Sequence, residues 1–352
     1  MEKIILTNLI PSEIIEQLEL SQKFRGDQIF KWVGNGVKDF DAMTNLSLDL
    51  RNQLKDKAIL RCTTLENILK DPDGTIKLQI KLSDGNIVET VLLTDKENRK
   101  TACVSCQAGC GMKCAFCMTG TLGLSRNLLP AEIVEQFLYL EEIAGKLDNI
   151  VFMGMGEPMQ NLSGIRKAVE ILCHKNGRNL SSKRITLSTC GVVKGIYDLA
   201  DNGPNIRLAV SLTTANEDLR KELMPVAVAK ENSLSELRNA IKYYAEKSGK
   251  RVTLEAALLA KTNTDRESAQ NMINFAKNLD VNVNLIPWNP VSILPFEEPS
   301  NNEVHNFVKQ LEDVGINVTL RTRRGRKIGG ACGQLGKTTN NLNKYTSHSV
   351  LE

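Results

Sequence analysis

The first part of this 352-residue chain has hydrophobic positions at helical spacing. Short helices are predicted to begin near Pro11, Asp27 and Leu46, because apolar side chains recur there three or four positions apart. A change of pattern follows these segments. We therefore predict a separate N-terminal helical accessory domain over residues 1–62.

The pattern then changes to an alternation of apolar and polar residues. Residues 76–82 and residues 87–93 both alternate, and an Asp-Gly turn signal lies between the two runs. This predicts a β-hairpin within a connector of residues 63–95. Side chains two positions apart share one face of a strand, so Glu89 is expected on the same face as the apolar Val91.

From residue 101 onward, short apolar runs alternate with helical patterns. Buried strands are predicted at residues 102–104, 150–153, 185–187, 208–212, 252–259 and 283–286. Helices are predicted to begin near Pro130, Ser163, Ser233, Arg266 and Glu303. Buried strands separated by helices predict an α/β fold with a parallel sheet and helices outside it. Six such units are fewer than the eight of a closed barrel, so a partial (βα)6 barrel is expected over residues 96–335.

Composition narrows the setting in which the protein works. The N-terminus lacks the apolar core of a signal peptide, and the chain contains no run of ~18 apolar residues of the kind that spans a membrane. A cytoplasmic protein is therefore expected. Thiols stay reduced in that compartment, and clustered cysteines there indicate metal binding or redox chemistry. The formal charge of +4 is too small to decide whether the chain binds nucleic acid. The polar stretch of residues 336–352 predicts a flexible tail.

Five cysteines fall within fifteen residues and carry most of the candidate chemistry: Cys103, Cys106, Cys110, Cys114 and Cys117. The last three have the spacing Cys-x3-Cys-x2-Cys, which a short loop can wrap round one inorganic centre with one coordination position left open. Two Cys-x2-Cys pairs could instead form a four-cysteine zinc site. The seven residues between those pairs are fewer than the ~15–20 usual in zinc ribbons. Unliganded thiols are the third possibility.

A glycine-rich segment follows the second predicted strand. Residues 152–158 read FMGMGEP. Glycines at a strand end let the backbone approach a ligand closely, and the carboxylate of Glu157 can accept hydrogen bonds from an ammonium group. Taken alone, such a segment is more often a plain turn.

Several segments together resemble a known family. The cysteine triplet reads AGCGMKCAFC over residues 108–117, which resembles the signature of the radical S-adenosylmethionine (SAM) superfamily. Further similar segments are FRGDQI at residues 24–29, TACVSCQAGC at residues 101–110, FMGMGEP at residues 152–158, LIPWNP at residues 285–290 and ACGQL at residues 331–335. From about Phe24 to Leu335, the chain resembles the radical SAM adenine methyltransferases of 23S ribosomal RNA, with an accessory domain that binds RNA.

The resemblance implies a 4Fe-4S cluster and SAM as cofactors, with two SAM molecules used in each turnover. Cys110, Cys114 and Cys117 would bind three irons, and SAM would bind the fourth through its amino and carboxylate groups. By position, contacts to SAM would come from Gly156, Glu157, Ser188, Ser211, Leu212, Thr213 and Asn289. The cofactors supply the difficult step, while the protein positions them and keeps water out.

The resemblance also implies a route to carbon C2 of adenine, which is too electron-poor to attack the methyl group of SAM directly. Cys332 would take a methyl group from one SAM, and a 5′-deoxyadenosyl radical from a second SAM would remove a hydrogen atom from that methyl. The methylene radical would add to C2 and attach the RNA to Cys332. Cys103 would then form a disulfide with Cys332 and release the methylated RNA. Glu89 would accept a proton, although without the family it would be taken for an ordinary surface glutamate.

The implied substrates are 23S ribosomal RNA, at adenosine 2503 of the peptidyl-transferase centre, and transfer RNAs, at adenosine 37. An electron donor such as flavodoxin is an expected partner, and the protein is expected to be a monomer without membrane contact. Residues 321–327 contain five basic side chains just before Cys332. Such a run can be a solvated strand end, but beside a thiol that must meet RNA it is predicted to bind phosphates without reading sequence.

Three positions depart from the family pattern. Cys106 stands where serine is common, Thr213 where histidine is usual and Lys327 where an acidic residue is usual. Pro158 resembles the branch that methylates C2, whereas a sister branch methylates C8 and confers antibiotic resistance. A zinc-stabilised RNA-binding protein without enzymatic activity is the alternative from a different class.

Overall fold

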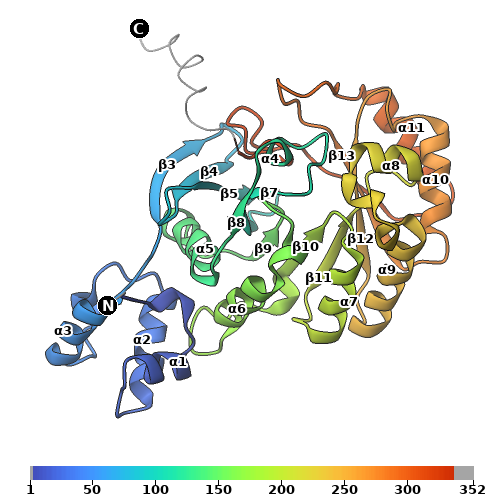
Figure 1. The fold of residues 1–352 in the computed structure, drawn as a ribbon. Coiled ribbons are helices and arrows are strands. Elements are labelled where there is room, and N and C mark those ends of the chain that lie inside the picture. The colour runs from blue at the N-terminus through green and yellow to red at the C-terminus, as the bar shows by residue number, and fades with distance from the viewer. Residues whose placement is uncertain (1–2, 337–352) are drawn as a thin grey trace, which may run out of the picture.

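The computed structural model describes residues 3–336 and shows a large sheet flanked by helices, with a helical lobe at one end (Figure 1). Apart from Gly336, the predicted tail lies outside this range. Within the described residues, no helix is both long enough and apolar enough to cross a membrane.

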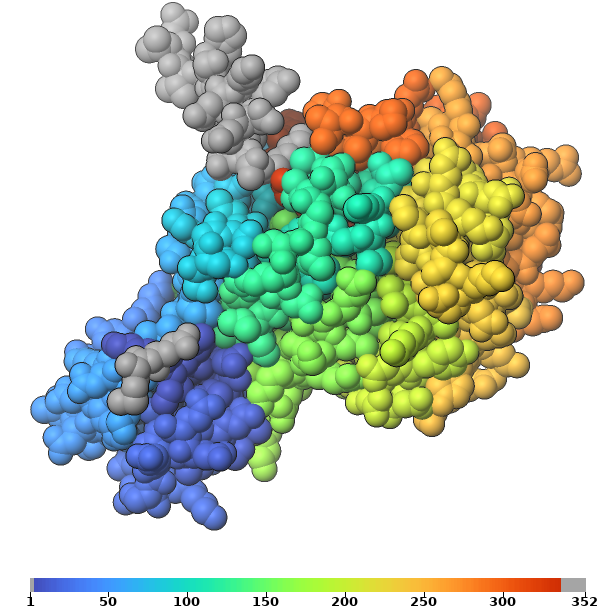
Figure 2. Space-filling model, viewed as in Figure 1, coloured from blue at the N-terminus to red at the C-terminus, as the bar shows by residue number. Residues whose placement is uncertain are grey.

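The N-terminal lobe contains the three predicted helices, α1 (Pro11–Gln17), α2 (Phe24–Gly34) and α3 (Leu48–Lys57). Short strands β1 (Ile4–Ile5) and β2 (Ala58–Ile59) pair in parallel beside them. Ile14, Ile29 and Leu54 are fully buried, so each helix contributes an apolar side chain to the core. In Figure 2 the lobe projects from the rest of the molecule in dark and mid blue.

The main sheet has ten strands in the order β14-β13-β12-β11-β10-β9-β6-β5-β4-β3. Seven neighbouring strands are parallel: β6 (Lys100–Cys103), β9 (Asn149–Phe152), β10 (Ile185–Thr189), β11 (Arg207–Ser211), β12 (Val252–Leu258), β13 (Val281–Pro287) and β14 (Val318–Leu320). The first six confirm the predicted strands. β14 was not predicted, because its three residues are half-buried or exposed and form no buried apolar run.

The antiparallel strands extend the same sheet. They are β3 (Thr64–Lys70), β4 (Ile76–Lys81) and β5 (Ile87–Thr94), and β5 pairs with β6 so that Val91 lies opposite Cys103. β4 and β5 confirm the predicted hairpin. The sequence did not reveal β3, because none of its residues is buried and the usual apolar face is missing.

The helices that follow the parallel strands are α5 (Pro130–Ala144), α6 (Leu162–Cys173), α7 (Val193–Asn202), α8 (Glu217–Leu223), α9 (Leu234–Ser248), α10 (Arg266–Ala276) and α11 (Asn301–Glu312). Five of them confirm predicted helices. α7 and α8 were missed, and α8 is a short, charged helix with only Arg220 and Leu223 buried. The small hairpin of β7 (Gln107–Cys110) and β8 (Gly123–Asn127), with α4 (Met118–Thr121) between them, follows β6 at the C-terminal edge of the parallel strands, where such barrels carry their sites.

Candidate active site

The cysteine triplet lies in the loop that closes the small β7–β8 hairpin. Cys110 pairs with Gly123 across the two strands, so the loop begins and ends at one place. Gly109 has a φ of +79°, and a Cβ atom there would lie 2.0 Å from the carbonyl oxygen of Gly123. Only glycine permits this approach, so the loop geometry depends on that residue.

Cys110, Cys114 and Cys117 all line one cavity, here called the triplet pocket. Among residues 3–336, no three Cys, His, Asp or Glu side chains are arranged to hold a single metal ion. A 4Fe-4S cluster does not require that arrangement, because each cysteine binds a different iron. Burial raises the pKa of Cys110 to about 12 and also raises that of Cys117, whereas a hydrogen bond from Cys190 lowers the pKa of Cys114.

The triplet loop is tied to segments from the far end of the chain. The indole Nε1 of Trp288 donates a hydrogen bond to the carbonyl oxygen of Phe116 at 2.9 Å. The amide of Met118 donates to the carbonyl oxygen of Gly333 at 2.8 Å. These two bonds join the loop to the segment after β13 and to the neighbour of Cys332.

The glycine-rich segment after β9 packs tightly against the loop after β6. A Cβ atom on Gly154 would lie 2.7 Å from the carbonyl group of Val104, and one on Gly156 would lie 2.6 Å from the side chain of Gln107. Gly156 also has a φ of +106°, which L side chains rarely adopt. The glycines thus serve the close approach of two loops that both lead to the pocket.

Glu157 is buried and faces the triplet pocket. Its Oε2 accepts a hydrogen bond from the amide of Cys190 at 2.8 Å, and its Oε1 accepts one from the amide of Met159 at 3.0 Å. Burial raises the pKa of this carboxyl, and the bond from Cys190 opposes that rise. Each carboxylate oxygen has a second lone pair, so Glu157 can still accept from an ammonium group of a ligand.

The structure brings most of the predicted SAM contacts to the triplet pocket. Its lining includes Gly156, Glu157, Ser188, Ser211, Thr213 and Asn289. Leu212 does not line the pocket: its side chain is fully buried in the core, and its carbonyl oxygen accepts a hydrogen bond from Arg220. Adjacent residues of an extended segment point to opposite sides, so Leu212 cannot share the direction of Ser211.

Two unpartnered acceptors show that the triplet pocket fits a polar ligand. The Oδ1 of Asn289 and the Oε2 of Glu255 are buried without any hydrogen-bond partner, and both residues line the pocket. A buried polar atom without a partner is costly. A ligand with N–H or O–H groups would satisfy both atoms, and SAM has both groups. Sequence reasoning missed Glu255, because a glutamate within an apolar strand carries no motif.

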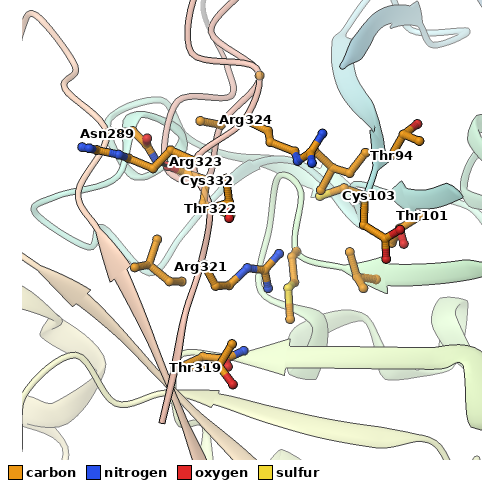
Figure 3. A pocket seen from close by; sticks show the side chains of 18 of the residues that line it. Thr94, Thr101, Cys103, Asn289, Thr319, Arg321, Thr322, Arg323, Arg324 and Cys332 are labelled. Atoms are coloured by element: carbon orange, nitrogen blue, oxygen red, sulfur yellow. Dashed lines mark hydrogen bonds between the residues drawn. The ribbon is translucent and has the colours of Figure 1, made fainter. Parts of the chain in front are cut away.

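Cys332 lines both the triplet pocket and a second cavity, the arginine pocket, which also contains Cys103 (Figure 3). Cys103 is buried at the end of β6, whereas Cys332 is exposed on the C-terminal segment. The carbonyl oxygen of Cys332 accepts a hydrogen bond from Nδ2 of Asn289 at 3.2 Å. All nine cysteines, including these two, are free thiols. The structure therefore brings together two thiols that are far apart in sequence.

Arg321 extends into the arginine pocket towards the side on which Cys103 lies (Figure 3). Burial raises the pKa of Cys103 to about 12, and the nearby Cys332 adds to this rise, while Arg321 opposes it. For Cys332, the protein around the pocket raises the pKa although the residue is exposed, and Arg321 again opposes the rise. Arg321 therefore favours the thiolate form of both cysteines.

The rest of the basic segment divides into two groups. Arg323 and Arg324 line the arginine pocket, whereas Arg326 and Lys327 do not. Arg323 and Arg326 both form ion pairs with Glu298. The charge of the pocket wall is therefore partly neutralised within the protein.

Glu89 lies in neither pocket lining. Its side chain is 2% exposed and forms an ion pair with Lys77 at 2.9 Å. The interpretation as a surface glutamate is therefore wrong, because β4 and the C-terminal segment cover it. Its Oε2 also accepts a hydrogen bond from the amide of Gly336 at 2.7 Å.

Family models match two parts of the chain. Residues 104–273 match the radical SAM superfamily, and residues 14–60 match the ribosomal RNA large subunit methyltransferase N-terminal domain. The crystal structure of a radical SAM methyltransferase from Sphaerobacter thermophilus superposes with a TM-score of 0.90 and 39% identity, over 94% of this chain and 99% of that one. Fold and site together therefore define a radical SAM methyltransferase.

Curated relatives identify the family. The chain is 59% identical over 97% of its length to the probable dual-specificity RNA methyltransferase RlmN of Treponema denticola, covering 98% of that protein. Proteins of the same name from Treponema pallidum and Alkaliphilus oremlandii are 54% and 42% identical, each over 95% of this chain and 97% and 98% of their own. The chain belongs to the RlmN family of RNA methyltransferases. It is thus a SAM-dependent enzyme acting on RNA, with a 4Fe-4S cluster implied by its superfamily.

Proposed function

We propose that this enzyme methylates carbon C2 of adenosine 2503 in 23S ribosomal RNA and of adenosine 37 in transfer RNAs, through a methyl group carried on Cys332. One observation supports this most strongly. Cys332 lines both the triplet pocket, which would hold the cluster and SAM, and the arginine pocket, which contains Cys103. A residue that carries a methyl group from SAM to RNA needs access to both.

The triplet pocket would hold both cofactors. Cys110, Cys114 and Cys117 would bind the cluster, which supplies the electron that converts SAM to methionine and a 5′-deoxyadenosyl radical. Glu157 and Asn289, which both line this pocket, would accept hydrogen bonds from SAM. Two SAM molecules would be used in each turnover, one as methyl donor and one as source of the radical.

Cys332 would react first as a thiolate and take the methyl group of one SAM. The 5′-deoxyadenosyl radical would take a hydrogen atom from that methyl, and the resulting methylene radical would add to C2 of the adenine and attach the RNA to Cys332. The adduct would then lose one electron, returned to the cluster, and the proton on C2. The thiolate of Cys103 would attack the sulfur of Cys332, so that an S–S bond forms as the S–C bond breaks, and the released carbon would take up a proton to become the methyl group. Because thiolates are the reactive species, the positive charge of Arg321 assists both thiols.

RNA would enter through the arginine pocket. Arg323 and Arg324 both line that pocket, and the charge of Arg323 is shared with Glu298. Arginines bind phosphates and fix the register of a nucleic acid without reading its sequence. The target adenine must leave its stack to reach Cys332, so local flipping of the base is expected. An electron donor such as flavodoxin and a monomeric state complete the proposal.

The test uses the full-length enzyme after anaerobic reconstitution, with a 23S ribosomal RNA fragment, SAM and dithionite as the source of electrons. Cys332→Ala is expected to abolish methylation, and Cys103→Ala is expected to trap RNA covalently on the protein. Cys106→Ser is the matched control, because Cys106 is buried close by but lines neither pocket. Normal turnover by Cys103→Ala would exclude the resolving role. Mass spectrometry against C2- and C8-methyladenosine standards decides the position of the methyl group.

A further inference from the structure

Lys77 and Glu89 form a buried ion pair outside both pockets. Their side chains are 1% and 2% exposed, and Nζ of Lys77 lies 2.9 Å from Oε1 of Glu89. The Nε2 of Gln79 also donates to Oε1 of Glu89 at 3.1 Å. Removing two charges from water is expensive, and such a pair is no simple gain in stability. The buried pair is therefore better explained by the other groups that the two side chains bind.

The pair binds the segment that carries Cys332 on both sides of that residue. Nζ of Lys77 donates to the carbonyl oxygen of Gly329 at 3.3 Å, three residues before the cysteine. Oε2 of Glu89 accepts from the amide of Gly336 at 2.7 Å, four residues after it. Each charge thus has a partner on a different side of Cys332.

The segment has little structure of its own. Residues 325–336 contain neither a helix nor a strand, and Gly329, Gly333 and Gly336 adopt positive φ values. Glycine-rich backbone loses much conformational freedom when it is fixed. Contacts from outside must therefore determine where Cys332 lies.

The start of the segment is held by the turn between β3 and β4. Oδ2 of Asp73 accepts from the amide of Gly325 at 2.7 Å, and Oδ2 of Asp71 accepts from the amide of Lys327 at 3.0 Å. The antiparallel strands and their turn thus grip the segment at its start, and the buried ion pair grips it on both sides of Cys332.

The same strands also fix Cys103. Val91 on β5 lies directly opposite Cys103 on β6, and Glu89 is two residues before Val91 on the same strand. We infer that Lys77 and Glu89 are positioning residues, forming a clamp that fixes the Cys332 segment relative to Cys103. That the position of Cys332 relative to Cys103 matters for catalysis rests on the proposed function, whereas the clamp itself does not. Within the family resemblance Glu89 is a proton acceptor; the clamp gives it a different role.

The test compares two double variants of the full-length protein. Lys77→Met/Glu89→Leu replaces the buried pair with apolar side chains of similar size, which is often tolerated by the fold. The matched control is Lys81→Met/Glu66→Leu, which removes an exposed ion pair between β4 and β3 at 3.6 Å. Glu89→Gln is a third variant, since it keeps an acceptor for Gly336 and loses only the charge. Thermal unfolding followed by circular dichroism shows whether each variant is folded.

The first readout is hydrogen exchange of the peptide covering residues 325–336. The clamp variant is expected to exchange about tenfold faster there than the native protein, with the control unchanged. The second readout is the equilibrium between the free thiols and the Cys103–Cys332 disulfide in a buffer of reduced and oxidised glutathione, determined by peptide mass spectrometry. Loosening the segment should lower the effective concentration of one thiol at the other by about tenfold.

If hydrogen exchange of residues 325–336 is unchanged in the clamp variant, Lys77 and Glu89 do not hold the segment. Faster exchange with an unchanged disulfide equilibrium would show that the clamp does not position Cys332. If Glu89→Gln abolishes methylation while the clamp variant leaves both readouts unchanged, Glu89 is a proton acceptor alone. If the native protein forms no such disulfide, the resolving role of Cys103 in the proposed function fails, and the exchange data still judge the clamp.

Discussion

The cysteine-triplet loop and the Cys332 segment both line the triplet pocket, but they are held there in different ways. The triplet loop closes on itself, because Cys110 pairs with Gly123 only thirteen positions later. The Cys332 segment is held by Asp71 and Glu89, whose hydrogen bonds span 256 and 247 positions of the chain. One element is a local structure, and the other exists only when the whole sheet has formed.

This difference matches the two kinds of chemistry. A cluster needs ligands at fixed positions, and a short closed loop supplies them at little cost in loop-closure entropy. In the proposed function Cys332 would meet SAM in one pocket and RNA in the other, and it lies on a glycine-rich segment that long-range hydrogen bonds hold at several points. The position of Cys332 therefore depends on bonds from several parts of the folded sheet.

Disrupting the pairing of β7 with β8 around Gly109 should change the cluster content of the protein most strongly. Gly109→Ala would place a Cβ atom 2.0 Å from the backbone of Gly123, at a φ of +79°. The strain alone costs about 1–3 kcal/mol, and the two strands must also move apart. We expect the variant to lose nearly all of its cluster, measured as iron and sulfide per protein after anaerobic reconstitution.

Gly249→Ala separates the two causes. Gly249 also has a positive φ, of +66°, but a Cβ atom there would meet nothing within 4 Å. It lies between the end of α9 and the start of β12, at the opposite edge of the sheet from the triplet loop. This control should keep its iron. Equal iron in both variants would mean that local closure does not organise the loop.

The same contrast explains what the sequence could predict. The spacing of Cys110, Cys114 and Cys117 predicted that one loop would bring the three thiols to one site, and they line one pocket because the loop is local. The six buried strands were equally clear, since each is a short apolar run. The sequence could not show that Leu212 points into the core while its neighbour Ser211 lines the pocket.

Long-range features were the ones that sequence reasoning missed. Glu89 was taken for a surface residue without the family, because nothing near it in sequence reveals Lys77 or the C-terminal segment that bury it. Glu255 lies within an apolar strand and gave no signal at all. The sequence also could not show that Arg321 lies near Cys103, Cys332 and Glu255. These residues come from strands and segments that meet only in the folded sheet.

The charge of Arg321 acts on both thiols of the proposed pair. Removing the positive charge in Arg321→Met should raise the pKa of Cys332 and Cys103 further above the usual thiol value. Since only the thiolate reacts, alkylation of Cys332 by iodoacetamide at pH 8 should slow about tenfold, which corresponds to one pKa unit. The rate–pH profile should move to higher pH. Peptide mass spectrometry follows each cysteine separately.

Arg323→Met is the matched control for that charge. Arg323 lines the same pocket, but it forms an ion pair with Glu298. It should leave the alkylation profile of Cys332 in place, and Arg321→Lys should recover part of the native rate. A profile that shifts equally in both methionine variants would point to a general field of the basic segment.

The weakest effect is expected at Glu255, whose buried carboxylate lowers the stability of the folded protein. Burial raises the pKa of Glu255, and its Oε2 has no partner. Glu255→Gln keeps an oxygen for the hydrogen bond from Asn284 and removes the buried charge. The variant without ligand should gain about 1 kcal/mol in free energy of unfolding at neutral pH, because a buried charge that Arg321 only partly compensates is lost.

The gain in stability of Glu255→Gln should depend on pH, in a direction that can be checked. The folded protein binds the proton of Glu255 more tightly than the unfolded chain does, so native stability falls as the pH rises from the unfolded pKa through the raised folded pKa. The gain of Glu255→Gln should therefore be full above the folded pKa and vanish below the unfolded one. Denaturant unfolding at several pH values measures it. A gain that persists in acid would arise from packing, and the triplet pocket would then carry no electrostatic cost at Glu255.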